Sequence, residues 1–508
     1  MNTSASGNII DKYNWFLQKS GIERKDYQFD GIQWCVHRET AQPLPITVSE
    51  SNGETSDVVI ADDNGRPIRG GFIADEMGLG KTIMMIATFV IHFVPRTLII
   101  LPNILVEQWH SEILRTTGHK ALIFHGPNKK KISLQQLLSA TIVISTYNTI
   151  AVTKPNKKNI YKPVKPNSLL HQVQWDRIVF DEAHHLRNKN SRWIGSKLLR
   201  TNIRWLISGT LIQNKRTDFF NLCNALGIPA RFYTNSEKIR LLIDMFVLKR
   251  TKKQVGISLP EVSIDNSTVC WNNETEQALS THIHHALIHT NNKLKFITRS
   301  RQFCILPSLI QPTFHRLLED KTVPSLQTSD DPLSGTTKIN AVVQTIVSRI
   351  HNGHGKLVFC HYRGEIDLLQ RLLKQHGVHN VGTFDGRINQ KERFRRLRSQ
   401  LDVIILQIQT GCEGLNLQKN FSEIYFVSPH WNPSIEDQAV ARCHRIGQNK
   451  PVTVFRFYMD ALHKTSPVDA NPSEKNTIYN ALQNGLNMEQ YIHSVQHSKR
   501  NISSLIMP

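Results

Sequence analysis

A glycine-rich segment between two apolar runs has the residue types and spacing that bind phosphate. Its sequence is Asp75-Glu76-Met77-Gly78-Leu79-Gly80-Lys81-Thr82. It follows an apolar strand that ends at Ala74 and precedes an apolar helix over 83–90. Glycines let backbone amides close around phosphate oxygens, Lys81 supplies a point charge and the Thr82 hydroxyl can ligate magnesium. The segment predicts a phosphate-binding loop at the start of a helix.

This loop departs from the strict pattern at its first position. The GxxxxGK[ST] motif begins with Gly, whereas Asp75 stands there in this chain. A chance Gly-Lys-Thr in a basic chain is the alternative explanation. A second motif at the expected place is therefore needed to support the nucleotide-binding interpretation.

A pair of carboxylates supplies that second motif. The run Ile178-Val179-Phe180-Asp181-Glu182-Ala183-His184 is an apolar strand that ends in two acidic residues. Sheets of α/β proteins place ligands at the carboxyl ends of their strands. Asp181 would hold magnesium, and Glu182 would orient or deprotonate the attacking water in phosphoryl transfer. A solvated strand end is the alternative for such a pair taken alone.

The elements that must position these groups are alternating strands and helices. In the first half, apolar β-type runs occur at 71–74, 97–101, 141–145, 177–180 and 204–208. A second series occurs at 356–360, 403–406, 424–427 and 452–457. Strands that alternate with helical patterns predict βαβ units and parallel sheets. We expect an α/β protein with domains at 1–248 and 338–470, an interlobe segment at 249–337 and a tail at 471–508.

Composition restricts the class of protein and of partner. The chain has 508 residues, with 62 Lys and Arg against 41 Asp and Glu, and a formal charge of +21. A positive excess of this size favours a polyanionic partner, and nucleic acid is the first candidate. The seven Cys lie far apart, without a Cys-x-x-Cys pair, which indicates reduced intracellular thiols. The longest apolar stretch, 83–94, is too short to span a bilayer, so we expect no membrane association.

Further motifs resemble a known family, the Swi/Snf-related ATPases, which form the chromatin-remodeller branch of the superfamily-two helicases. The resemblance covers most of the chain. Its motifs are Tyr27-Gln28 with Gly31 and Trp34; Pro102, Leu105, Gln108-Trp109 and Glu112; Ser145-Thr146-Tyr147; Ser208-Gly209-Thr210 with Gln213-Asn214; and Gln438, Ala439, Arg442 and His444-Arg445-Ile446-Gly447-Gln448.

The resemblance implies a fold, a set of cofactors and site residues. It implies two RecA-like lobes with a helical, irregular interlobe insertion, and it implies ATP and Mg²⁺ as cofactors. The implied catalytic residues are Lys81, Asp181, Glu182, Arg442 and Arg445. The implied nucleotide-binding residues are Gln28, Asp75, Glu76, Met77, Gly78, Leu79, Gly80, Lys81, Thr82 and Gln438, and the implied magnesium ligands are Thr82 and Asp181.

The two arginines belong to the second half of the chain. Arginine spreads its charge over a planar fork, which suits the γ phosphate in the transition state better than a compact lysine does. Arg442 and Arg445 are spaced i, i+3, and we expect them on one face of a helix. Two arginines on a solvated helix are the alternative, which the neighbouring Gln438 and Gly447-Gln448 disfavour.

The chain departs from the family pattern at three further positions. Leu211 stands where relatives usually carry Pro, Gln409 where they carry a basic residue, and Cys412 where they carry Gly. These departures bear on coupling and DNA contact rather than on hydrolysis. In motif detail the chain resembles the post-replication-repair and transcription-termination subgroup. Family members as compact as this chain include proteins of large DNA viruses as well as stripped cellular forms. No RING-type Cys/His spacing occurs, so we expect no ubiquitin-ligase activity.

The resemblance implies a DNA-dependent ATPase that moves on double-stranded DNA and displaces or remodels protein–DNA complexes in transcription, replication or repair. A strand-separating DNA or RNA helicase and a nucleotide-gated DNA-binding scaffold are the alternatives. We expect protein partners for targeting and action as a monomer. We expect an intracellular location, either the nucleus or, for a viral protein, a cytoplasmic replication site or the virion.

Three segments remain outside these motifs. The histidines His282, His284, His285 and His289 lie in an expected linker helix with no Cys partner, which disfavours a metal site. The Lys- and Pro-rich segment 154–167 is expected to be a surface insertion. The tail after about Thr465 shows no strong pattern.

Overall fold

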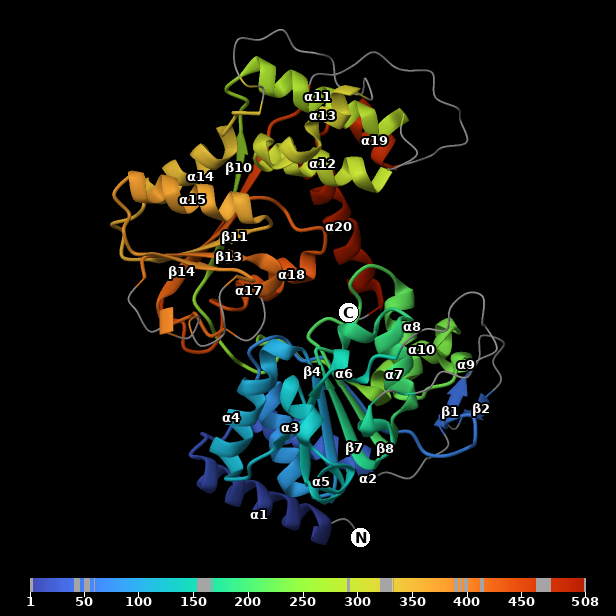
Figure 1. Ribbon diagram of the computed structural model, residues 1–508. Coiled ribbons are helices and arrows are strands. Elements are labelled where there is room, and N and C mark those ends of the chain that lie inside the picture. The colour runs from blue at the N-terminus through green and yellow to red at the C-terminus, as the bar shows by residue number, and fades with distance from the viewer. Residues whose placement is uncertain are drawn as a thin grey trace. The chain divides into compact units, whose positions relative to one another are not determined.

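The structure is a computed structural model, and its chain divides into two compact units (Figure 1). Unit 1 comprises Met1–Ser258 with Ile502–Pro508, and unit 2 comprises Leu259–Asn501. The described residues are 3–506 except 41–45, 50–54, 59, 153–165, 167, 290–292, 320–330, 332, 388–391, 393–394, 397–400, 412–414 and 463–476. The segment expected to be a surface insertion, 154–167, therefore lies almost wholly outside the described residues.

Unit 1 is built on a seven-stranded parallel sheet with the order β5-β6-β4-β7-β8-β3-β9. All five strands predicted in the first half are present. The strand bounds are β3 Arg69–Ile73, β4 Thr97–Leu101, β5 Leu122–Ile123, β6 Ile142–Thr146, β7 Gln174–Asp181, β8 Arg200–Ile207 and β9 Val247–Leu248. A separate antiparallel pair consists of β1 Ile46–Ser49 and β2 Thr55–Val58.

Helices cover both faces of this sheet because its central strands are apolar on both sides. Ile99 and Leu101 pack in one core with α1 to α4, whereas Leu98 and Ile100 pack in the opposite core with α8 to α10. Continuous apolar strands are typical of such doubly covered parallel sheets. The helix bounds are α1 Thr3–Ser20, α2 Asp26–Thr40, α3 Lys81–Ile91, α4 Val106–Thr117, α5 Leu134–Ser139, α6 Tyr147–Ile150, α7 Ser191–Leu198, α8 Arg216–Leu226, α9 Ala230–Tyr233 and α10 Ser236–Phe246.

Unit 2 contains a six-stranded parallel sheet with the order β10-β15-β14-β11-β13-β12. The four strands predicted in the second half are all present. The strand bounds are β10 Val262–Val269, β11 Gly355–Cys360, β12 Val381–Phe384, β13 Val403–Gln407, β14 Phe421–Phe426 and β15 Val452–Met459. Two parallel sheets flanked by helices confirm the predicted fold class.

The segment predicted to be irregular contributes an edge strand and three helices to unit 2. β10 pairs in parallel with β15 over its whole length. Most β10 side chains are exposed, so the strand lacks the apolar pattern from which strands are predicted. The helices of unit 2 are α11 Glu274–His289, α12 Lys293–Ile305, α13 Gln311–Glu319, α14 Thr337–Ser348, α15 Arg363–Gln375, α17 Ile408–Gly411, α18 Pro433–Val440, α19 Thr477–Gln483 and α20 Met488–Ile506.

The expectation that the tail has no strong pattern is wrong for α20. Met488, Tyr491, Ile492 and Val495 follow an i, i+3, i+4, i+7 spacing and pack in a core with α11, α12 and α13. His284 of α11 joins this packing, because its Nε2 accepts a hydrogen bond from the Met488 amide at 3.0 Å. The pKa of His284 falls to about 4 because the ring is buried, so the neutral imidazole serves as a structural hydrogen-bonding group.

The division into two compact units can be set beside the predicted segments. The boundary between the compact units falls at residue 258, and the predicted division at 1–248, 249–337, 338–470 and 471–508 stays a prediction. No helix within the described parts of the chain is both long and apolar enough to cross a bilayer.

Candidate nucleotide site

The predicted phosphate loop connects β3 to α3 in unit 1. Gly78 and Gly80 adopt positive φ angles of 93° and 82°, which residues with a Cβ rarely adopt. Lys81, the first residue of α3, donates from Nζ to the Asp75 carbonyl at 2.7 Å and to the Glu76 carbonyl at 3.3 Å. The loop therefore wraps around the lysine ammonium with its backbone turned as a phosphate-binding loop requires.

Asp75, which departs from the strict motif, is buried against an arginine from the end of unit 1. Arg250 Nε lies 3.1 Å from Asp75 Oδ1, and Nη2 lies 2.5 Å from Oδ2. The same guanidinium donates to the carbonyl of Tyr27 in α2. A bidentate pair of this kind fixes both partners in orientation as well as in distance. The carboxylate thus anchors the start of the loop at a position where the strict motif has glycine.

Glu76 is bound by the segment that contains Arg250 and follows β9. Its Oε1 lies 2.9 Å from Lys252 Nζ, and its Oε2 accepts from the Lys252 amide at 2.8 Å. The Glu76 amide donates to the Arg250 carbonyl at 2.9 Å. Arg250 and Lys252 both fall within the predicted interlobe segment 249–337, for which the sequence predicts no contact with the loop. Their role at the loop depends on a contact across more than 170 positions, for which a single sequence carries no local signal.

Gln28 lies at the loop, as the motif predicts. Its buried side chain donates from Nε2 to the Leu79 carbonyl at 3.1 Å. A Cβ at Gly80 would lie 2.4 Å from that nitrogen, so the glycine is needed for this close approach as well as for its φ angle. The amide of Gln28 is thereby placed beside the tip of the phosphate loop.

Asp181 ends β7 at the same edge of the sheet as the loop. Both Asp181 and Ile73, the last residue of β3, align with Ile207 of β8. Asp181 Oδ2 accepts from Trp109 Nε1 at 2.6 Å, and Oδ1 accepts from the Glu182 amide at 3.0 Å. Burial and the neighbouring Glu182 raise the pKa of Asp181 to about 7. A nearby cation would oppose that shift, as Lys81 already does in part.

Glu182 has an uncommon backbone conformation. Its φ angle is 50°, and no other non-glycine residue among those described has a positive φ. Strained backbone of this kind clusters at functional sites. Its Oε2 lies 3.2 Å from His184 Nδ1, and the same His184 nitrogen lies 3.5 Å from Ser208 Oγ at the end of β8. A chain of polar side chains therefore links the second carboxylate to the motif that begins at Ser208.

Gly209 completes this edge. A Cβ at Gly209 would lie 3.1 Å from Met77 Cε and 3.7 Å from Lys81 Nζ. The segment after β8 therefore packs directly over the phosphate loop. Leu211, another departure from the family pattern, is buried in the core beneath this segment. Unit 1 thus brings together the predicted residues Gln28, 75–82, Asp181 and Glu182.

Gln438, Arg442 and Arg445 lie together in unit 2, around the end of α18. The expectation that the arginines share a helix face is wrong, because α18 ends at Val440 and both arginines follow it in turns. The turns bury Cys443 in the sheet core and let the Arg442 carbonyl accept from the Leu417 amide at 3.1 Å. Arg445 donates from Nη1 to Asn416 Oδ1, and burial together with Arg442 lowers its pKa.

Two atoms of this cluster are buried without a hydrogen-bond partner among the described residues. They are Nε2 of Gln438 and Nε of Arg442. A buried donor without an acceptor costs free energy, and such a group often marks a place where a ligand binds. Of the two remaining departures in this unit, Gln409 is exposed and Cys412 lies outside the described residues.

Comparison with protein families identifies the chain. The model of the SNF2-related domain matches residues 27–312, and the model of the helicase conserved C-terminal domain matches residues 337–447. The chain belongs to the SNF2-related family. The matched domains are those of helicase-type ATPases, and the two parallel-sheet units correspond to the two lobes that the resemblance implies. The resemblance to the Swi/Snf-related ATPases is confirmed.

Individual relatives of this SNF2-related ATPase differ greatly in length. Chromodomain-helicase-DNA-binding protein 6 of Rattus norvegicus is 28% identical over 440 residues, covering 76% of this chain and 16% of the relative. The probable global transactivator of Orgyia pseudotsugata multicapsid polyhedrosis virus is 27% identical over 472 residues, covering 86% of each protein. The human DNA excision repair protein ERCC-6-like is 25% identical over 477 residues, covering 77% of this chain and 38% of the relative.

One solved structure can be set beside these sequences. The Sulfolobus solfataricus SWI2/SNF2 ATPase core in complex with double-stranded DNA is 21% identical, with a TM-score of 0.38, and the match covers 86% of this chain and 88% of that one.

Proposed function

We propose that this SNF2-related ATPase moves along double-stranded DNA and displaces or remodels protein–DNA complexes in transcription, replication or repair. The observation that carries the proposal is the juxtaposition of the phosphate loop, Gln28, Asp181 and Glu182 at one edge of the unit 1 sheet. The charge of +21 supports a polyanionic track, to which binding would depend mainly on phosphate contacts.

The residues at this edge fit ATP and magnesium. The glycine-rich loop offers backbone amides and the Lys81 ammonium to phosphate oxygens. Thr82 and Asp181 provide the hydroxyl and carboxylate oxygens that Mg²⁺ prefers, and the raised pKa of Asp181 marks a buried carboxylate that a cation would stabilise. A bound magnesium ion would neutralise charge on the transferred phosphoryl group.

Each catalytic role in the proposal follows from the position of a side chain. Glu182 is the base that orients and deprotonates the attacking water, and His184 holds one of its oxygens. Lys81 binds the β and γ phosphates. Gln28 bonds the adenine edge, which requires its amide to exchange the Leu79 carbonyl for the base.

The proposal gives unit 2 the part of stabilising the transition state. Arg442 and Arg445 contact the γ phosphate, and Gln438 belongs to the same nucleotide-binding set. The buried donors of Gln438 and Arg442 support this part, because they have no acceptor among the described residues. With both lobes engaged, repeated closure on ATP would step the protein along the DNA.

The proposal places the protein where DNA is, either in the nucleus or, for a viral protein, at a cytoplasmic replication site or in the virion; one relative of similar length is viral. It acts as a monomer, with partner proteins for targeting.

Steady-state ATP hydrolysis tests this proposal most simply. The purified chain is assayed with no nucleic acid, single-stranded DNA, double-stranded DNA or RNA, at two salt concentrations and beside Glu182→Gln. We expect stimulation by duplex DNA that falls steeply with salt, and a loss of about 10² to 10⁴ in kcat for Glu182→Gln with ATP binding retained. Preferential stimulation by single strands or RNA would favour a strand-separating helicase. An active Glu182→Gln protein would overturn the assignment of the base, and no turnover with any nucleic acid would favour a nucleotide-gated scaffold.

A further inference from the structure

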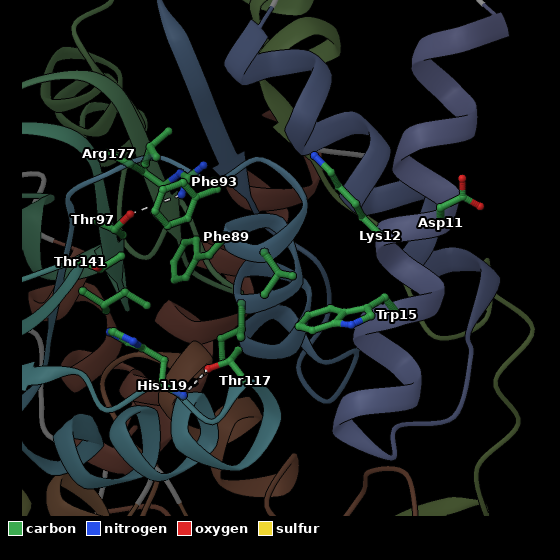
Figure 2. A pocket seen from close by; sticks show the side chains of 14 residues that line it. Asp11, Lys12, Trp15, Phe89, Phe93, Thr97, Thr117, His119, Thr141 and Arg177 are labelled. Carbon is green, nitrogen blue, oxygen red and sulfur yellow. Dashed lines mark hydrogen bonds between the residues drawn. The ribbon is translucent and has the colours of Figure 1, made fainter.

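Unit 1 carries a groove at the edge of its sheet opposite the phosphate loop. Its volume is about 570 Å³, which is within the range of about 300 to 1,000 Å³ typical of ligand sites. Helix α1 forms one side, the end of α3 forms the floor, and the starts of β4 and β6 form the other side (Figure 2). We call it the α1 groove; the residues that matter to its chemistry are Lys12, Trp15, Phe89, Phe93, His119 and Arg177.

Two aromatic side chains at this groove are unusually exposed. Trp15 is 53% exposed and Phe93 is 66% exposed, although both belong to a well-packed unit. The core needs neither ring, since Tyr13 and Phe16 already fill the buried face of α1. Exposed aromatics around a concave apolar floor are typical of protein-binding sites, because burying them on binding removes apolar surface from water.

The wall opposite α1 contains a buried arginine. Arg177 is fully buried and holds Glu39 through Nε at 2.6 Å and Nη2 at 2.5 Å. Its Nη1 donates to Thr97 Oγ1 over 3.4 Å, a long contact drawn in Figure 2. Because the guanidinium is fully buried and bound to Glu39, it closes this wall of the groove and is not offered to an occupant.

The charges around the groove favour an acidic occupant. Lys12 and His119 line it and are exposed. Lys19, about two turns after Lys12 in α1, and Lys120, next to His119, are exposed as well. Asp11 is the one acidic lining residue. A second copy of this chain would bring its own charge of +21 to a basic rim, which opposes self-association there.

We propose that the α1 groove binds an amphipathic helical segment of an acidic partner protein. Apolar side chains at i, i+3 or i+4, and i+7 of the segment enter between Trp15 and Phe93 and cover Phe89 on the floor. Acidic side chains on its flanks face Lys12 and Lys120. Helix-in-groove binding of this type combines apolar anchors with charge complementarity at the rim.

The inference is independent of the nucleotide site. The groove lies at the amino-terminal ends of the strands, and the phosphate loop at the carboxyl-terminal ends. Binding therefore tethers the ATPase to a partner without blocking the nucleotide, and Lys81→Ala should leave it unchanged.

Fluorescence polarisation with a defined probe tests the inference. The probe is a fluorescein-labelled helical peptide of about 20 residues, with Leu and Phe on one face and Glu elsewhere. A peptide of the same composition in scrambled order and one with Lys in place of Glu are the controls. We expect the full chain to bind the first peptide with a Kd at least about tenfold lower than that of either control.

Variants then locate the binding site. Trp15→Ala and Phe93→Asp should each raise the Kd about tenfold or more, and Lys12→Glu with Lys120→Glu should do so through charge alone. The matched control is Leu138→Asp, which alters another exposed apolar residue of unit 1 outside the groove. Unchanged ATP hydrolysis and circular dichroism establish that the variants are folded. Absence of binding, equal binding of the control peptides, or equal binding by the groove variants would overturn the proposal.

Discussion

The two units differ in whether the polar atoms of their predicted site residues have hydrogen-bond or ionic partners. In unit 1 the loop lysine, Asp75, Glu76 and Asp181 all have hydrogen-bond or ionic partners within the unit. In unit 2 the described cluster at the end of α18 leaves Nε of Arg442 and Nε2 of Gln438 buried without partners. Under the proposed function, unit 1 would receive the nucleotide by itself, and the buried donors of unit 2 would be completed by an acceptor that this unit does not supply.

A change in the unit 2 arginines should have the largest effect on turnover. Arg445→Ala is expected to lower kcat about 10³-fold, because arginines that stabilise transition-state charge on a phosphoryl group contribute 10³ to 10⁵. Arg445→Lys should recover little of it, since an ammonium cannot reproduce the planar fork. Steady-state hydrolysis at saturating ATP and duplex DNA measures both variants. Near-normal kcat in Arg445→Lys would show that only a positive charge is needed.

A change in the partner of Asp75 should weaken unit 1 next. Arg250→Ala leaves a buried carboxylate without its cation, which costs about 3 to 5 kcal/mol of stability in comparable pairs and disorders the start of the loop. We expect a rise of 10-fold or more in the ATP concentration needed for half-maximal rate, together with a lower unfolding temperature.

The matched control for this change is Asp75→Asn combined with Arg250→Ala. Removing both charges should recover part of the unfolding temperature, because the unpaired buried charge is gone. If the double variant is no more stable than Arg250→Ala, the ion pair is not what stabilises the loop.

The hydrogen bond from the Trp109 indole to Asp181 is expected to affect magnesium binding in unit 1. Trp109→Phe removes the hydrogen bond to Asp181 Oδ2 and retains an aromatic ring. Partners that orient a metal ligand typically contribute 10- to 100-fold to metal affinity. We expect about a tenfold rise in the magnesium concentration that gives half-maximal ATP hydrolysis, with little change in kcat at saturating magnesium. An unchanged magnesium dependence would assign Trp109 to packing alone.

The smallest expected effect concerns Glu365, a buried carboxylate in unit 2. Glu365 is fully buried and accepts hydrogen bonds from the amides of His361 at 2.9 Å and Tyr362 at 3.0 Å. Burial raises its pKa from 4.5 to about 7. Between these values the folded chain holds a proton that the unfolded chain has released, so the contribution of Glu365 to stability falls as pH rises through this window.

Glu365→Gln removes that dependence and keeps an oxygen for the two amides. From pH 4.5 to pH 7.5 the wild type should lose about 1 to 3 kcal/mol of unfolding free energy relative to the variant. Urea unfolding of the full chain at the two pH values measures the difference. A stability difference that does not change with pH would show that Glu365 is ionised in the folded protein.

Much of this fold, together with the phosphate loop and the carboxylate pair of the candidate site, could be predicted from sequence for a physical reason. Buried parallel strands are continuous apolar runs, and the phosphate loop and Asp181-Glu182 each lie within a few residues of such a run. The exposed strand β10 carries no such pattern, so the sequence does not predict it. The amphipathic spacing in α20 is present in the sequence and is sufficient to predict this helix.

The missed site residues depend on long-range contacts. Arg250 and Lys252 reach the loop across more than 170 positions, and Trp109 reaches Asp181 across 72. Trp109 belongs to a family motif that does not indicate which atom it contacts, and Arg250 and Lys252 fall in the predicted interlobe segment. The prediction that Arg442 and Arg445 lie on one helix is wrong, because an i, i+3 spacing alone does not distinguish a helix from successive turns.

Equilibrium binding of a fluorescent ATP analogue to Arg445→Ala and Lys81→Ala, beside the wild type, tests the division between the units most directly. If unit 1 holds the nucleotide by itself, Arg445→Ala should bind the analogue within about threefold of the wild-type Kd, whereas Lys81→Ala should bind about 100-fold more weakly or not at all. Equal loss of binding in both variants would contradict this division and place nucleotide binding in both units.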